Sequence, residues 1–133
     1  MTGKYSKIQK LAWAFAGLFL FVYSLDYVPG IMYPNGKMFG LFGMTPLVDF
    51  GHLALGTLAL ISGFISAKVS RIYFWALGVW YGVDVIMFFT SHFNTMTLLV
   101  NAAVNMPHFV ISIAAFWIAM NVDRPHETTP VRT

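Results

Sequence analysis

Apolar residues gather into four long runs along the chain, and short polar stretches separate them. The runs cover about residues 8–28, 46–67, 72–90 and 98–121. A helix needs about 20 mainly apolar residues to cross a hydrocarbon core of ~30 Å. Each run is close to that length, so the pattern predicts an all-α integral membrane protein with four transmembrane helices in a bundle. The first run has a basic start, but no small-residue cleavage site follows it, and we interpret it as a helix rather than a signal peptide.

The ends of the runs carry signals that favour helix boundaries. Thr45 and Pro46 supply a capping hydroxyl and a first-turn proline for the second helix. The sequence VPG at residues 28–30 is typical of a helix end. Residues 123–133 are polar and contain proline, which predicts a disordered tail behind one transmembrane domain formed by residues 1–122.

Composition supports the membrane class. Apolar residues make up 58% of the chain and charged residues 10%, with a mean hydropathy of +0.69, outside the balance of a soluble domain. The chain has no cysteine, which excludes disulfides, thiolate metal ligands and a cysteine nucleophile.

The positions of the basic residues predict the topology. Lys4, Lys7, Lys10, Lys68, Arg71, Arg124 and Arg132 all fall on one side of the four runs, and only Lys37 falls on the other. Because Lys and Arg are enriched in cytoplasmic segments, we expect both termini in the cytoplasm. The loops at residues 29–45 and 91–97 would then lie outside.

Polar residues repeat within the apolar runs. Each half of the chain contains Tyr-x-x-Asp, a loop and then Asp/Asn-x-x-His. The members are Tyr23, Asp26, Asp49 and His52 in the first half, and Tyr81, Asp84, Asn105 and His108 in the second. Since both halves would start in the cytoplasm, the pattern indicates a parallel repeat of two helix pairs.

The depth of these residues points to one shared site. At a rise of 1.5 Å per residue, every ionisable residue within the runs falls in the outer half of the membrane. A charge facing lipid costs roughly 2.5–3.5 kcal/mol, so we expect these side chains to face the interior of the bundle. The predicted intramembrane polar pocket, open to the outside, comprises Asp26, Asp49, His52, Asp84, Asn105 and His108.

Three interpretations of this pocket stay open. The polar side chains can act as interhelical hydrogen-bond contacts that hold the bundle together. Alternatively, His52 and His108 can ligate haem iron, or can bind a divalent metal together with Asp49 and Asp84. In the third, His and Asp side chains relay protons during the transport of a small solute, although the cytoplasmic half has no matching polar chain.

An enzymatic activity is not indicated. The chain has no serine elbow, no glycine-rich phosphate loop and no extramembrane segment large enough for a catalytic domain. The few basic residues fit the topology and give no nucleic-acid signature. We therefore expect a non-enzymatic membrane protein, either an accessory subunit of a larger membrane complex or a homo-oligomer.

Two segments carry a family resemblance. Residues 38–64, MFGLFGMTPLVDFGHLALGTLALISGF, and residues 100–119, VNAAVNMPHFVISIAAFWIA, resemble a family of small bacterial four-helix membrane proteins classified as a domain of unknown function. Members resemble this chain in having Asn/Asp-x-x-His at the starts of the second and fourth helices. The resemblance implies corresponding roles for Asp49, His52, Asn105 and His108 and a bacterial cytoplasmic membrane, and it implies no activity.

Overall fold

The structure, a computed structural model, describes residues 3–124. Its helices are α1 (Lys7–Leu25), α2 (Pro46–Ile65), α3 (Ala67–Ser91) and α4 (Leu98–Asn121). Each is long and apolar enough to cross a membrane, which confirms the predicted four-helix membrane protein. Two short strands, β1 (Lys37–Met38) and β2 (Phe42–Gly43), pair antiparallel in the loop between α1 and α2. Most of the predicted disordered tail, from residue 125 onward, lies outside the described residues.

Polar side chains define where the first two helices begin. Ser6 and Gln9 form a capping box at the start of α1, in which each side chain bonds the backbone N–H of the other residue. The hydroxyl of Thr45 accepts a hydrogen bond from the backbone N–H of Val48, and Pro46 occupies the first turn of α2. These contacts confirm the predicted start of the second helix.

A single residue separates α2 from α3. Ser66 ends α2, and its hydroxyl caps the first turn of α3. The third helix therefore begins at Ala67 rather than at residue 72, because the basic residues that suggested a loop lie in its first turns. The first helix ends at Leu25 rather than at residue 28, consistent with the preference of the residue before Pro29 for extended backbone.

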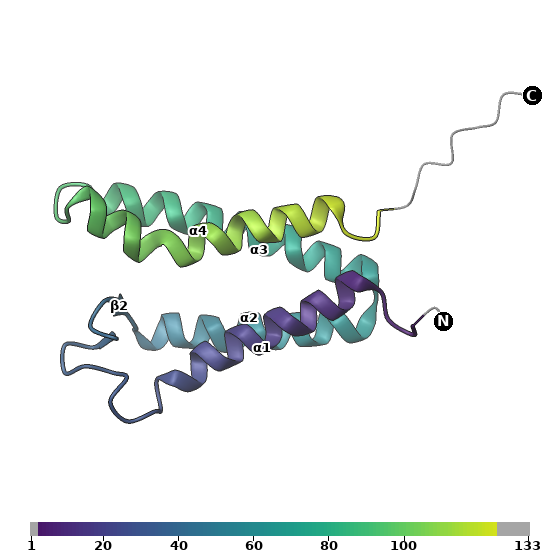
Figure 1. Ribbon diagram of the computed structural model, residues 1–133, viewed down its shortest axis with the longest axis horizontal. Helices are drawn as coiled ribbons and strands as arrows, with labels where there is room; N and C mark the ends of the chain where they lie inside the picture. The colour runs from purple at the N-terminus through teal and green to yellow at the C-terminus, as the bar shows by residue number, and fades with distance from the viewer. Residues whose placement is uncertain (1–2, 125–133) are drawn as a thin grey trace, which may run out of the picture.

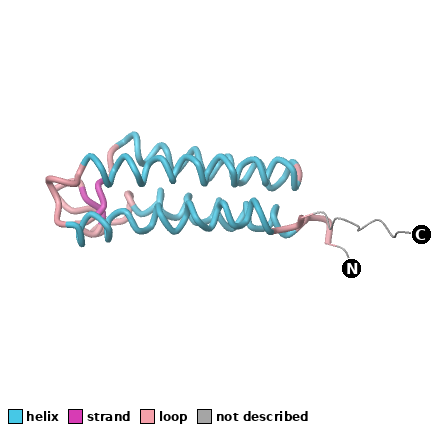
Figure 2. The backbone as a smooth tube through the Cα atoms, turned by 90° about the horizontal axis from the view of Figure 1, so that it is seen from above, coloured by secondary structure: helices cyan, strands magenta, loops and turns pink. Residues whose placement is uncertain are grey.

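The four helices form two antiparallel hairpins, α1 with α2 and α3 with α4 (Figures 1 and 2). The start of α1, the junction at Ser66 and the end of α4 lie together at one end of the bundle, here called the termini end. The loops at residues 26–45 and 92–97 lie at the opposite end, here called the loop end. α4 packs mainly against α3, whereas α3 also contacts α1 and α2 and so joins the two hairpins.

Close packing between α1 and α2 depends on small residues. Gly56 faces Leu20, and Gly63 faces Trp13 and the backbone carbonyl of Gln9. A Cβ at Gly56 would come within 2.8 Å of the Leu20 side chain, closer than carbon atoms approach in a packed interior. In a membrane, where lipid is as apolar as the side chains, such close van der Waals packing is a main source of helix association.

Aromatic side chains join α1 to α3. Phe15 packs edge to face against Phe74 with ring centroids 5.1 Å apart. Nearer the loop end, Phe19 stacks on Tyr81 with centroids 5.9 Å apart. Phe19, Phe74 and Tyr81 are buried, so these pairs form the contact between the hairpins in the middle of the bundle.

A charged cluster closes the termini end. The Arg71 guanidinium at the start of α3 donates hydrogen bonds to the backbone carbonyls of Ala119, Val122 and Asp123 at the end of α4. The Asp123 carboxylate accepts a hydrogen bond of 2.8 Å from the backbone N–H of Ile8 in α1. The last carbonyls of a helix such as α4 and the first N–H groups of a helix such as α1 have no partners within the helix. Arg71 and Asp123 supply partners to some of these groups, and they thereby connect α1, α3 and α4.

Candidate functional site

A cavity of about 390 Å³ lies between the two hairpins at the loop end. All four helices and the loop that follows α1 contribute to its lining. Its walls are mostly apolar, and the side chains include Leu18, Phe19, Val22, Met38, Phe42, Phe88, Val104 and Ile111. The polar side chains in the wall are His52, Asp84, Asn105 and His108. This size, with an apolar lining and a few polar groups, is typical of a small-molecule site.

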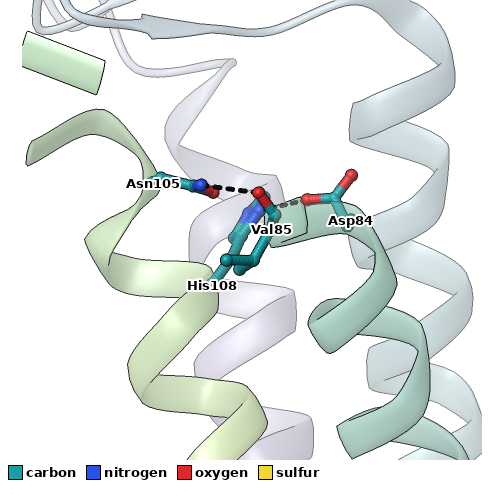
Figure 3. Close-up of polar contacts among 4 residues, drawn as sticks. All are labelled: Asp84, Val85, Asn105 and His108. Carbon is teal, nitrogen blue, oxygen red and sulfur yellow. Dashed lines mark hydrogen bonds and ion pairs between the residues drawn. The ribbon is translucent and has the colours of Figure 1, made fainter. Parts of the chain in front are cut away.

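The strongest polar contact in the pocket joins α3 to α4. Nδ1 of His108 lies 2.6 Å from a carboxylate oxygen of Asp84, as Figure 3 shows. Beside an ionised Asp84, which can only accept hydrogen bonds, Nδ1 would be the donor and Nε2 of the same ring would stay available. The His108 and Asp84 side chains are 35% and 46% exposed, so both can be reached by a ligand.

His52 lies on the opposite hairpin and has no comparable partner. The residue is only 8% exposed, and its buried Nδ1 has no hydrogen-bond partner within ordinary geometry among the described residues. The stacked rings of Phe19 and Tyr81 each neighbour one of the histidines: the ring centroids of Phe19 and His52 lie 6.2 Å apart, and those of Tyr81 and His108 lie 4.6 Å apart. The two histidines line the same pocket from different hairpins.

Other polar residues of α4 serve as contacts between helices. The side-chain amide of Asn105 donates a hydrogen bond of 2.8 Å to the backbone carbonyl of Val85 (Figure 3). Asn101 and Ser112 likewise donate to backbone carbonyls of α3. Asn101, Asn105 and Ser112 thus act as interhelical hydrogen-bond contacts, which is the first of the three interpretations of the polar residues. That interpretation does not account for His52.

Four of the six residues predicted for the polar pocket lie around the cavity, and two do not. Asp26 and Asp49 are absent from its lining. Asp26 caps the end of α1, whereas Asp84, its counterpart in the sequence repeat, lies inside α3. The two halves therefore place equivalent residues at different depths, and Asp84 contacts His108 while Asp26 contacts Asp49.

Asp26 and Asp49 form a separate carboxyl pair at the loop end of the first hairpin. Burial and the neighbouring carboxyl group of Asp49 raise the pKa of Asp26 from 3.8 to about 6. The hydroxyl of Tyr27 lies 3.4 Å from Oδ2 of the Asp49 carboxyl group. Two carboxyl groups this close share one proton more readily than they carry two charges.

This pair makes stability depend on pH. We expect the free energy of unfolding to fall as the pH rises from about 4 to about 6. In that window the folded Asp26 keeps a proton that the unfolded chain has released, and above it the folded state must hold a second charge beside Asp49. Tryptophan fluorescence can follow unfolding by sodium dodecyl sulfate in mixed micelles. Repeating the titration at a series of pH values measures the expected fall in the free energy of unfolding.

The variant Asp26→Asn should flatten the profile and be more stable than wild type at pH 7, since its side chain does not ionise. Asp123→Asn removes one carboxylate at the opposite end and should keep the wild-type slope. Equal slopes in wild type and Asp26→Asn would show that the carboxyl pair does not control the pH dependence.

Sequence reasoning missed the apolar part of the pocket. Met38 is buried and lines the cavity together with Phe42, although both lie in the loop between α1 and α2. The signal was present in the sequence: MFGLFGM at residues 38–44 is an unusually apolar run for an external loop. Such a run predicts that the loop folds back onto the bundle, because apolar side chains avoid water.

The residues that could hold a cofactor are few. Among residues 3–124, no three His, Asp or Glu side chains come together as a metal-binding group. Axial ligation of a haem needs only two histidines, and His52 and His108 line the same cavity.

Comparisons of the chain with family models, with curated protein sequences and with solved structures found no match. The resemblance to a bacterial four-helix family therefore stays a prediction. The function has to be argued from the pocket itself.

Proposed function

We propose that this multi-pass membrane protein is non-enzymatic and binds a small, mainly apolar molecule in the loop-end pocket. The proposed location is the bacterial cytoplasmic membrane, with the termini end in the cytoplasm and the pocket near the outer leaflet. This orientation rests on the distribution of Lys and Arg.

The observation that carries the proposal is an apolar cavity whose wall brings His52 together with the hydrogen-bonded pair Asp84–His108. Intramembrane ionisable residues mark functional sites more often than residues elsewhere do, and His52 shares its cavity with the Asp84–His108 pair.

The surroundings of that pair support binding rather than catalysis. A His–Asp pair activates a nucleophile only when a hydroxyl or thiol lies within hydrogen-bond reach of the ring. The chain has no cysteine, and the hydroxyls of Ser62, Ser70 and Ser112 all donate to backbone carbonyls. Among the residues that the structure describes, no serine, threonine or tyrosine belongs to the lining of the cavity.

The proposal predicts that a small molecule accompanies the protein through gentle purification. Native mass spectrometry of wild type released from nanodiscs should show an adduct of small-molecule mass. The variant Val22→Trp places a bulky side chain in the cavity wall and should lack that adduct. Val104→Trp fills the cavity from α4 and serves as an independent second block.

The matched control is Ile86→Trp, which adds the same bulk on an exposed face of α3 outside the cavity. It should keep the adduct. An adduct that survives both cavity-filling variants, or no adduct on wild type, would contradict small-molecule binding in this pocket.

A haem or metal site is the second candidate, and the Asp84–His108 contact favours it. Ligating histidines usually donate their other ring nitrogen to a carboxylate, which orients the ring and raises its basicity. His108 has that arrangement, with Nε2 left for a ligand. An absorption spectrum with elemental analysis tests this candidate: a Soret band or stoichiometric metal in wild type should vanish in His52→Ala/His108→Ala.

A further inference from the structure

The charges around the pocket indicate which class of molecule it takes. The charged residues in the loop-end half of the helices and in the loops at that end are Asp26, Lys37, Asp49 and Asp84. Of these, only Asp84 lines the cavity. No lysine or arginine among residues 3–124 lines it, so an anionic group would find no permanent positive partner among them.

The Asp84 carboxylate has one oxygen that accepts no hydrogen bond from the described residues. Its Oδ2 accepts the hydrogen bond from His108, and no described residue donates to Oδ1. Figure 3 shows this second oxygen directed away from His108. The Asp84 side chain is 46% exposed, and it borders both this cavity and an open groove on the surface of α3. A carboxylate with one oxygen free of hydrogen-bond donors attracts a positive charge.

The rest of the wall suits an organic cation rather than a hydrated metal ion. Phe19, Phe39, Phe42 and Phe88 all line the cavity. The faces of aromatic rings attract cations, and aromatic walls are the usual recognition site for quaternary ammonium groups. An inorganic cation would need several more oxygen ligands than this wall offers.

Resting on the proposed function, we infer that the ligand is a lipophilic organic cation, an ammonium or phosphonium group with apolar substituents. Asp84 is the counter-ion, and the phenylalanines surround the apolar substituents. The substituents occupy the space between α1 and α4, where Val22 and Val104 face the cavity from opposite hairpins.

Tetraphenylphosphonium and tetraphenylborate provide a matched pair of probes, because they have nearly the same size and shape and opposite charge. The protein is reconstituted in phosphatidylcholine nanodiscs, and equilibrium dialysis measures binding above that of empty nanodiscs. Wild type should bind tetraphenylphosphonium saturably at one site per chain. Tetraphenylborate should bind at least about tenfold more weakly, as expected for a like charge near a partly desolvated carboxylate.

Variants separate the contributions of charge and shape. Asp84→Asn should weaken tetraphenylphosphonium binding about tenfold or more, while its amide oxygen still accepts from His108. Phe88→Leu should weaken the binding of the cation roughly threefold to tenfold, with a smaller effect on the anion. Asp123→Asn removes the same charge at the termini end and should leave affinity within about twofold.

The outcomes distinguish this inference from the proposed function. Equal binding of both probes, abolished by Val22→Trp, would overturn the cation and leave small-molecule binding intact. Binding of neither probe, together with an adduct on wild type that Val22→Trp removes, would also overturn the cation alone. Binding of neither probe and no adduct would overturn both. Unchanged affinity in Asp84→Asn would show that Asp84 is not the counter-ion.

Discussion

Replacing Arg71 by alanine is expected to lower the free energy of unfolding by about 3 kcal/mol. Its guanidinium donates to three backbone carbonyls at the end of α4. Those carbonyls have no helical partners of their own, and hydrogen bonds from a charged donor contribute more than neutral ones. The loss should also loosen Asp123, which bonds the first turn of α1.

A lysine at the same position tests whether geometry or charge matters. Arg71→Lys keeps the positive charge but cannot present a planar fork of donors to several carbonyls, so it should recover less than half of the loss. Lys68→Ala removes a basic residue of the same helical turn that is exposed, and it should change stability by less than about 0.5 kcal/mol. Unfolding in mixed micelles measures all three variants, and full recovery by lysine would contradict a role for the fork.

The sequence predicted the number and approximate limits of the helices because length and apolarity alone decide whether a segment can span a bilayer. It failed at the junction between α2 and α3. The two basic residues Lys68 and Arg71 favour a loop at residues 68–71, whereas in the structure Ser66 alone makes the connection. A capping serine directly before a helix was a better local signal there than the charges were.

The polar site was harder to predict than the helices. Helical spacing predicts that His52 shares a face of α2 with Asp49, and Asn105 a face of α4 with His108, because residues three and four apart share a face; of these, His52, Asn105 and His108 line the cavity. It could not place Asp26, whose position depends on where α1 ends, or show that Asp84 rather than Asp49 contacts a histidine. These positions and contacts depend on how the two hairpins pack against each other. The spacing of residues within a single helix carries no information about that packing.

Packing between α1 and α2 gives the second large expected effect. Gly63→Ala should cost about 2–3 kcal/mol of stability. An added Cβ would lie 2.6 Å from Cδ1 of Trp13 and 3.0 Å from the backbone oxygen of Gln9. The Trp13 ring packs against Phe64 and Tyr5, so it cannot simply rotate away, and the two helices would have to separate.

Gly51→Ala is the matched control, because it lies in the same helix and a Cβ there meets nothing within 4 Å. It should be neutral or stabilising by up to about 1 kcal/mol, since alanine favours a helix more than glycine does. The two variants therefore carry the same chemical change and should move stability in opposite directions. Equal effects would show that helix propensity, and not the contact with α1, governs both positions.

A double variant assigns the cost of Gly63→Ala to its cause. If the Trp13 ring is the obstacle, Gly63→Ala/Trp13→Phe should be more stable than the sum of the two single changes allows, because the smaller ring leaves room for the new methyl group. If the Gln9 backbone is the obstacle, the two effects should add. The Gln9 side chain also donates a hydrogen bond of 2.9 Å to the Gly63 carbonyl, which holds the two helices close together at this point. Additive losses would therefore show that Gly63 is needed because the α1 backbone lies so close to it.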